Sequence, residues 1–240
     1  MTKKNILVFK HMPSQNPGIF RDFAESQNVN FIEIDLHAGD KIPDLKGFDG
    51  LWVMGGSMNV WEEDKYPWLI EEKKAIRYAV EDLKKPFLGI CLGHQLLAEA
   101  MGGKAINTGR YEVGLFEIKP TKEGLNHPLL QNLKESEKWV NAHLVEVIEA
   151  PKDAIILASS ENCQNHVMQV GENAYSCQFH PEVCSHTLDG WMKISGVPDF
   201  FEELSINGLD DLTSSITENL DVNNKASSVL FENWCNLVLN

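Results

Sequence analysis

The stretch Pro86-Phe87-Leu88-Gly89-Ile90-Cys91-Leu92-Gly93-His94-Gln95 combines a predicted strand, a tight turn and the start of a predicted helix. Its apolar first half predicts a short buried strand, and from Leu92 to Met101 the apolar spacing becomes helical. Gly102-Gly103 then supplies a helix stop. Cys91 therefore lies between a strand and a helix, with a glycine two residues to either side. This is the G-x-nucleophile-x-G pattern of a nucleophile elbow, with cysteine in place of serine.

The position of Cys91 also favours a reactive thiol. A helix N-terminus carries partial positive charge and unpaired N–H groups, which lower the pKa of a thiol and can hold an oxyanion. The flanking glycines suit a sharp turn that leaves no room for side chains. A bare G-x-C-x-G pattern also fits a buried structural cysteine beside a capping glycine, so a second motif is needed to decide.

That second motif is the stretch Ala174-Tyr175-Ser176-Cys177-Gln178-Phe179-His180-Pro181-Glu182-Val183. Pro181 has no N–H and disfavours helical backbone at the preceding residue, so the strand should stop and leave His180 at its tip. His180 can then act as general base toward Cys91, and Glu182 can orient the imidazole. The two motifs together favour a catalytic cysteine.

Gly-Ile-Cys-Leu-Gly-His-Gln followed by Gln-Phe-His-Pro-Glu-Val resembles the class I (triad) glutamine amidotransferase family. Within that family the resemblance is to stand-alone proteins similar to the glutaminase domain of GMP synthetase. It extends from about Ile6 to Glu182. A third feature agrees, because Leu51-Trp52-Val53-Met54-Gly55-Gly56-Ser57 reads as a strand running into a Gly-Gly loop, where the family places half of its oxyanion hole.

The resemblance implies a mechanism and a set of catalytic residues. Cys91 would attack the γ-carboxamide carbon of glutamine or of a γ-glutamyl amide, and a γ-glutamyl thioester would form. His180 would take the thiol proton and deliver it to the leaving amine, while Glu182 would hold the histidine tautomer. The backbone N–H groups of Gly56 and Leu92 would receive the developing oxyanion.

The expected substrate contacts are Gly55, Gln95 and His143. Gln95 matches the glutamine after the family's nucleophile, although it also fits a polar residue on the first turn of a helix. The family often carries a Trp/His/Asp cluster between its two motifs, and here Trp139 to Glu146 corresponds to it. His143 aligns, but the acidic residue comes later, as Glu146. The choice between free glutamine and a larger γ-glutamyl compound therefore stays open.

The rest of the chain predicts an α/β fold. Strands at 5–10, 29–36, 48–54 and 86–90 alternate with helices at 19–26, 67–83 and 92–101, which indicates a parallel sheet with its ligand site beyond the carboxyl ends of the strands. Strands at 113–120, 138–147 and 155–160 and a hairpin over 167–179 predict an added antiparallel part. Helices follow from 185, the last over 225–239. The resemblance implies the flavodoxin-like form of this fold, and residues 1–240 are expected to be one domain.

Composition narrows the possible partners. The net charge of −14 argues against nucleic acid, which needs a basic face. An odd count of 5 cysteines without C-x-x-C spacing fits reduced thiols in the cytoplasm. No apolar run approaches the ~20 residues of a membrane span, and no signal peptide is evident. We expect no cofactor and no metal, since His37, His127, His166 and His186 show no metal-ligand spacing with acidic residues.

The sequence contains no Gly-rich ATP-pyrophosphatase loop, so any acceptor chemistry must come from elsewhere. Three hypotheses follow: a self-sufficient hydrolase or transferase of γ-glutamyl amides or peptides, a glutaminase subunit that supplies ammonia to a separate synthase chain, or a silent binding or regulatory protein. The intact set of Cys91, His180 and Glu182 argues against the last. The resemblance to stand-alone proteins favours the first.

Overall fold

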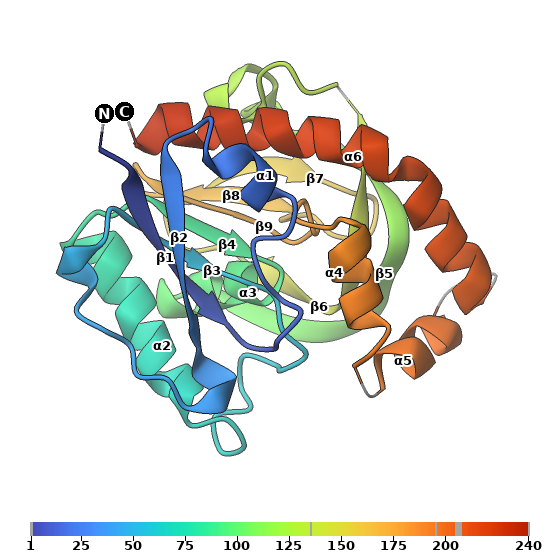
Figure 1. The fold of residues 1–240 in the computed structure, drawn as a ribbon, viewed down its shortest axis with the longest axis horizontal. Helices are drawn as coiled ribbons and strands as arrows, with labels where there is room; N and C mark the ends of the chain where they lie inside the picture. Colours follow the sequence, from blue (N-terminus) through green and yellow to red (C-terminus); the bar gives the residue numbers. More distant parts are fainter. Residues whose placement is uncertain (1, 135, 195, 205–207, 240) are drawn as a thin grey trace.

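The described strands of the chain form one sheet flanked by helices on both faces (Figure 1). The computed structural model describes residues 2–134, 136–194, 196–204 and 208–239. The strands are β1 (Lys4–Lys10), β2 (Val29–Asp35), β3 (Gly50–Val53), β4 (Phe87–Ile90), β5 (Lys104–Pro120), β6 (Glu137–Glu149), β7 (Ile155–Ser159), β8 (Val167–Val170) and β9 (Ala174–Cys177). The α-helices are α1 (Phe20–Ala24), α2 (Trp68–Arg77), α3 (Leu92–Ala100), α4 (Ser185–Trp191), α5 (Val197–Leu204) and α6 (Leu209–Val238).

The sheet has a parallel half and an antiparallel half. Its nine strands run in the order β2-β1-β3-β4-β9-β8-β7-β5-β6. All pairings from β2 to β9 are parallel, and they follow the doubly wound order of flavodoxin-like folds. The pairings from β9 to β6 are antiparallel. The predicted α/β fold class with an antiparallel extension is confirmed.

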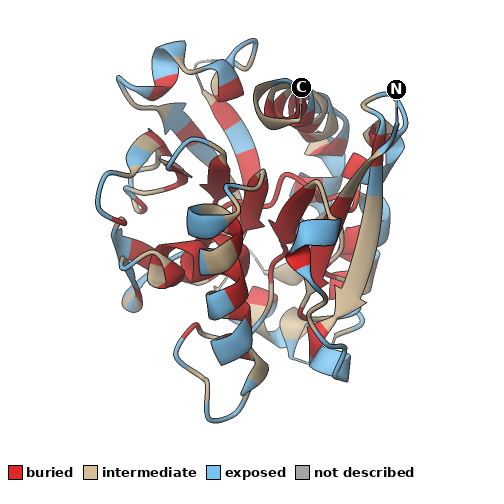
Figure 2. Ribbon diagram, turned by 90° about the vertical axis from the view of Figure 1, so that its left-hand side faces the viewer, coloured by how far each residue is buried: buried red, intermediate tan, exposed pale blue. Residues whose placement is uncertain are grey.

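The parallel strands in the middle of the sheet are mostly buried (Figure 2). Their alternate side chains enter two hydrophobic cores, as the two-residue period of a strand requires. On one face Trp52 packs edge-on against Phe231 and Trp234 of α6, with ring centroids 5.7 and 5.3 Å away. On the other face Leu51 and Val53 join the apolar side chains of α2 and α3. The carboxyl ends of β3, β4 and β9 are thereby held at one edge of the sheet.

The last helix is longer than the sequence predicts. It begins at Leu209, whereas the expected helix began at 225. The apolar spacing continues upstream as Leu212, Ile216 and Leu220, all buried against Val113 and other residues of a third core. Most residues on the exposed face of that half are Asp, Ser or Thr, whose low helix propensity hides the helical spacing in the sequence.

Other boundaries also differ from prediction. β5 begins at Lys104 rather than 113, because the polar residues of its first half still pair with β6 across a shift in register. α2 ends at Arg77, and a π-helical turn over Tyr78–Asp82 completes the predicted helix. α1 is shorter than 19–26. Of the helices that the structure describes, none combines the length and the hydropathy needed to cross a bilayer.

Candidate active site

Cys91 lies at the end of β4 in a backbone conformation that residues with a side chain seldom adopt. Its φ is +52° and its ψ is −104°. Hydrogen bonds hold this conformation: the Cys91 N–H donates to the Cys177 carbonyl at 2.9 Å, and the Cys91 carbonyl accepts from His94 and Gln95 at 3.0 and 3.1 Å. The thiol therefore projects from a rigid junction between β4 and α3.

Gly89 and Gly93 allow this junction to close. A Cβ at Gly89 would lie 2.5 Å from the Gly93 carbonyl oxygen, and a Cβ at Gly93 would lie 2.0 Å from the Val53 carbonyl oxygen. Both clashes are with backbone atoms, which cannot rotate away as a flexible side chain can. The close approach of α3 to β3 and β4 is therefore the physical reason for the glycine on each side of the cysteine.

His180 follows β9 and lies between Cys91 and Glu182. Its Nδ1 is 2.7 Å from Glu182 Oε1, and its N–H donates to the Val140 carbonyl at 2.8 Å. Burial lowers the pKa of His180, but the charges of Glu182 and Cys91 and hydrogen bonds to both side chains outweigh burial and raise it to about 10. Cys91, His180 and Glu182 thus meet at the carboxyl ends of β4 and β9, and each is buried.

The C-terminal helix contacts the segments that carry both motifs. The Ser227 hydroxyl donates to the carbonyl of Pro181, between His180 and Glu182, at 2.6 Å. The Trp234 indole N–H donates to the carbonyl of Phe87 at 3.2 Å, on the strand that ends at the cysteine.

The Gly55-Gly56 loop follows β3 and packs against both motifs. A Cβ at Gly55 would lie 3.1 Å from the His180 ring, and a Cβ at Gly56 would lie 2.7 Å from a methyl group of Leu92. Leu92 is the first residue of α3, where backbone N–H groups have no intrahelical partner. The two residues predicted to form an oxyanion hole therefore lie next to each other, beside Cys91.

A buried His11–Glu72 pair supports this loop, and sequence reasoning missed it. His11 Nδ1 lies 2.8 Å from the Gly55 carbonyl oxygen, and its Nε2 lies 2.8 Å from Glu72 Oε1. Burial lowers the pKa of His11, yet the charge of Glu72 and its hydrogen bond raise it overall. The ring also stacks on Trp68, with centroids 5.4 Å apart. No local spacing connects His11 to Glu72, so only the fold reveals the pair.

The remaining predicted contacts occupy different surroundings. Gln95 Nε2 donates to the Val145 carbonyl at 3.0 Å and to Gln178 Oε1 at 3.1 Å, which ties the start of α3 to β6. His143 is buried and lines the same cavity as Cys91. Glu146 instead pairs with Arg110 at 2.8 Å and does not line that cavity. Residues 143 and 146 are three positions apart on β6, so their side chains leave opposite faces of the strand.

His94 is buried beneath the elbow. Its Nδ1 lies 2.9 Å from the Ser176 hydroxyl oxygen. Burial, together with the nearby His166 and His143, lowers its pKa to about 3. The ring is therefore neutral near pH 7 and links α3 to β9 through Ser176.

Above Cys91 lies a cavity of about 410 Å³. One side carries polar groups that include Gln15, Asn59, Gln95, His143 and His180. Other lining residues form an apolar wall that comes from α4, α5 and Ile194, which follows α4. This apolar wall consists of Trp191, Ile194, Val197, Phe200 and Phe201. Sequence analysis assigned no role to these residues, because their spacing is that of ordinary packing helices.

Comparison with known proteins shows the family. The sequence model of the family Glutamine amidotransferase class-I matches residues 14–193. The chain is 37% identical over 153 residues to a subunit of the glutamine-hydrolyzing GMP synthase of Sulfolobus acidocaldarius, covering 62% of this chain and 74% of the relative. It is 33% identical over 168 residues to the protein of the same name from Saccharolobus solfataricus, which covers 68% of this chain and 84% of the relative.

The fold also matches solved structures. A glutamine amidotransferase from Thermotoga maritima superposes with a TM-score of 0.86 at 24% identity, covering 98% of this chain and 99% of that one. The family match spans both motifs and the loop after β3. This chain belongs to the class I glutamine amidotransferase family.

Proposed function

We propose that the protein hydrolyses or transfers the γ-glutamyl group of γ-glutamyl amides, with Cys91 as nucleophile, and that it acts without a synthase chain. His180 takes the proton of the Cys91 thiol, and the resulting thiolate attacks the γ-carbonyl carbon to form a C–S bond. His180 then delivers that proton to the leaving amine as the C–N bond breaks. Water or an acceptor amine then attacks the thioester, His180 accepts its proton, and the Cys91 sulfur leaves.

The surrounding groups supply the rest of the barrier reduction. The N–H groups of Gly56 and Leu92 hold the oxyanion, and each such donor is worth about 3–4 kcal/mol. Proton transfer by His180 contributes roughly 10²–10⁴ in rate. Glu182 orients the imidazole through Nδ1, which leaves Nε2 for the thiol.

One observation carries this proposal: the buried Glu182–His180 pair meets Cys91 beside the Gly55-Gly56 loop, and both Cys91 and His180 line one cavity. Nucleophile, base, orienting carboxylate and oxyanion donors are the set that acyl transfer requires. They come from the ends of β3, β4 and β9.

The apolar wall supports a substrate larger than glutamine. The amide of free glutamine ends in an NH₂ group, which gains nothing from contact with Trp191 or Phe200. An amine with an aliphatic or aromatic group would bury that group there, at about 25 cal/mol for each Å² removed from water. We therefore propose γ-glutamyl amides of apolar amines as substrates.

A second candidate function is that of the glutaminase chain in a two-chain amidotransferase. The relatives named as one subunit of GMP synthase favour it, because such a name implies a further chain. In that case glutamine would be the substrate and the ammonia would pass to a partner.

Amine release from glutamine and from γ-glutamyl benzylamide by the purified chain separates the candidates. We expect higher kcat/KM for the benzylamide. Phe200→Ala should lower that value several-fold and leave the value for glutamine unchanged, because Phe200 meets only the apolar group. Turnover of glutamine that appears only with an added synthase chain would support the two-chain enzyme instead. No turnover of either compound and no glutamyl adduct on Cys91 would overturn both.

A further inference from the structure

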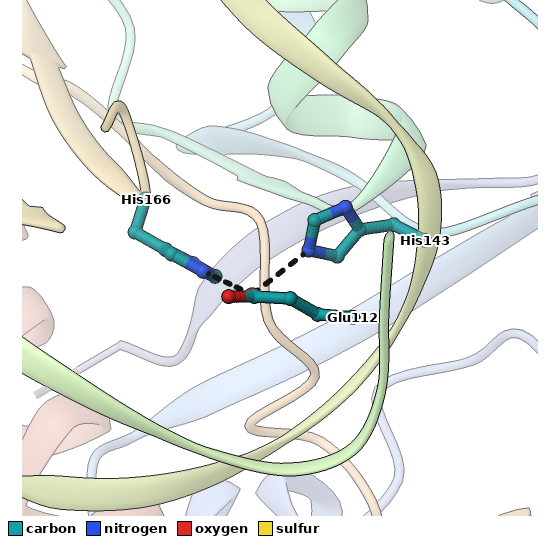
Figure 3. Close-up of side chains that lie close together, drawn as sticks. All are labelled: Glu112, His143 and His166. Atoms are coloured by element: carbon teal, nitrogen blue, oxygen red, sulfur yellow. Dashed lines mark hydrogen bonds and ion pairs between the residues drawn. The ribbon is translucent and has the colours of Figure 1, made fainter. Parts of the chain in front are cut away.

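A second cluster of chemically active side chains lies beside the cavity, outside the Cys91–His180–Glu182 set (Figure 3). His166 Nε2 lies 2.7 Å and His143 Nε2 lies 3.2 Å from the same oxygen, Glu112 Oε2. One potential ligand atom from each residue lies within 4.8 Å of the others, and all three residues are buried. In Figure 3 both rings point toward the carboxylate from opposite sides.

The sheet itself holds these residues together. Glu112 and His143 are directly paired across β5 and β6, so their side chains leave the same face. His166 precedes β8, where its N–H donates to the Ala158 carbonyl at 3.0 Å and its carbonyl accepts from the Gln178 N–H at 2.8 Å. Each ligand therefore comes from a hydrogen-bonded strand or its edge, and the cluster is rigid before any ligand arrives.

The cluster is centred on a buried carboxylate. The Ser160 hydroxyl donates to Glu112 Oε1 at 2.6 Å, and the two imidazoles lie within hydrogen-bonding distance of Glu112 Oε2. Within the described residues, the ion-pair partners of Glu112 are these histidines, and no lysine or arginine is among them. Buried charges in proteins are paired or coordinate metals.

We propose that Glu112, His143 and His166 bind a divalent transition-metal ion, of which Zn²⁺ fits best. Two imidazole nitrogens and one carboxylate oxygen are a common three-residue zinc set, with a fourth position left to water or substrate. Zinc lies about 2.0–2.2 Å from such atoms, which places tetrahedral ligands about 3.3–3.5 Å apart. The 3.2 and 2.7 Å separations between each imidazole nitrogen and Glu112 Oε2 would lengthen slightly, and the ligand atoms, which lie within 4.8 Å of one another, would draw into the same range around the ion. Mg²⁺ and Ca²⁺ prefer oxygen ligands alone.

The surroundings also limit the affinity. Coordination through Nε2 moves each ring proton to Nδ1, and the buried Nδ1 atoms of His143 and His166 have no hydrogen-bond partner in the described structure. A hydrogen-bond acceptor for the non-coordinating imidazole nitrogen typically strengthens metal binding by about 10–100-fold. We therefore expect this site to bind zinc about 10–100-fold more weakly than sites whose histidine ligands have such acceptors.

Because His143 also lines the cavity above Cys91, metal binding would fix its ring and place a cation close to the substrate. The site is not needed for the thiol chemistry proposed above. Its tests use no activity measurement, so either proposal can fail alone.

Zinc titration of tag-free Cys91→Ala protein against a chromophoric chelator tests the site, since this background removes the competing Cys91 thiol. We expect one equivalent of Zn²⁺ to bind. Glu112→Gln keeps the shape but removes the charge, and should weaken binding at least 100-fold. His127→Asn removes a histidine that instead contacts Gln169, and should leave the affinity unchanged. Absence of a stoichiometric site, or equal affinity in Glu112→Gln, would overturn the proposal.

Co²⁺ absorption provides a second measurement that does not depend on how well Glu112→Gln folds. In the Cys91→Ala protein, Co²⁺ should give the visible bands of a low-coordinate nitrogen and oxygen site, with no sulfur-to-cobalt charge-transfer band. A charge-transfer band would place a thiolate such as that of Cys163 at the metal and refute this ligand set. A spectrum identical to that of hexaaquacobalt would refute binding altogether.

Discussion

Cys91 combines two unusual properties: it has a positive φ, and it is the N-cap residue of the buried helix α3. Backbone strain of this kind costs about 1–3 kcal/mol and persists only when the surroundings enforce it. Here the Cys177 carbonyl and the two flanking glycines do so. A residue held in this way keeps its side chain fixed relative to His180.

We expect Cys91→Ser to retain the fold and to lose turnover by about 10³-fold or more, because an unactivated hydroxyl is a much poorer nucleophile than a thiolate. Steady-state amine release measures the loss. The thermal midpoint should stay close to that of the wild type, since one buried atom changes. Undiminished activity in this variant would refute the assignment of the nucleophile.

Glu182→Gln should lower kcat/KM less than His180→Gln does, because orienting the imidazole is worth less than transferring the proton. Glutamine keeps an oxygen near His180 Nδ1 but removes the charge that raises the pKa of the imidazole. Parallel kcat/KM values of the two variants give the comparison. The reverse order would mean that His180 is not the base.

His94 should make the protein less stable in acid. Its pKa is lowered to about 3, so between pH 6.5 and 3 the unfolded chain binds a proton at this residue that the folded chain does not. The contribution of His94 to the free energy of unfolding is complete above pH 6.5. It is lost as the pH falls toward 3, by up to about 1.4 kcal/mol per pH unit.

His94→Asn, which can still bond to Ser176, should flatten this dependence. Urea unfolding at several pH values from 7 to 4 measures it. If His94→Asn leaves the slope of unfolding free energy against pH unchanged, groups other than His94 cause the loss of stability in acid.

At the scale of elements, the contact between α3 and β3 controls the site. Gly93 is the point of closest approach, and a methyl group there would meet the Val53 carbonyl oxygen at 2.0 Å. α3 would have to move away from the sheet and take the Leu92 N–H with it.

We therefore expect Gly93→Ala to lower the free energy of unfolding by about 1–3 kcal/mol and to reduce kcat in the protein that still folds. Gly47→Ala is the matched control, because a Cβ there would meet nothing within 4 Å, and it should change stability by less than about 0.5 kcal/mol. Denaturant unfolding and amine release measure both variants. Equal effects of the two substitutions would contradict the role of this contact.

At the scale of the whole molecule, local patterns could predict the parallel half of the sheet. The apolar strands, the glycines around Cys91 and the proline after His180 each encode their geometry within a few residues. The pairing of His11 with Glu72, and of Glu112 with His143 and His166, depends on strand register and crossovers over dozens of residues, so no spacing in the sequence shows it. The first half of α6 escaped prediction because its polar residues are weak helix formers.

The position of α6 has a consequence for how the protein is made. Ser227 bonds to Pro181 and Trp234 to Phe87, so this helix secures the backbone of both segments that carry the chemistry. Domains generally fold as units while they emerge from the ribosome. A nascent chain that has exposed both motifs but not yet α6 lacks these two hydrogen bonds, so we expect its thiol and imidazole to align only after that helix has docked.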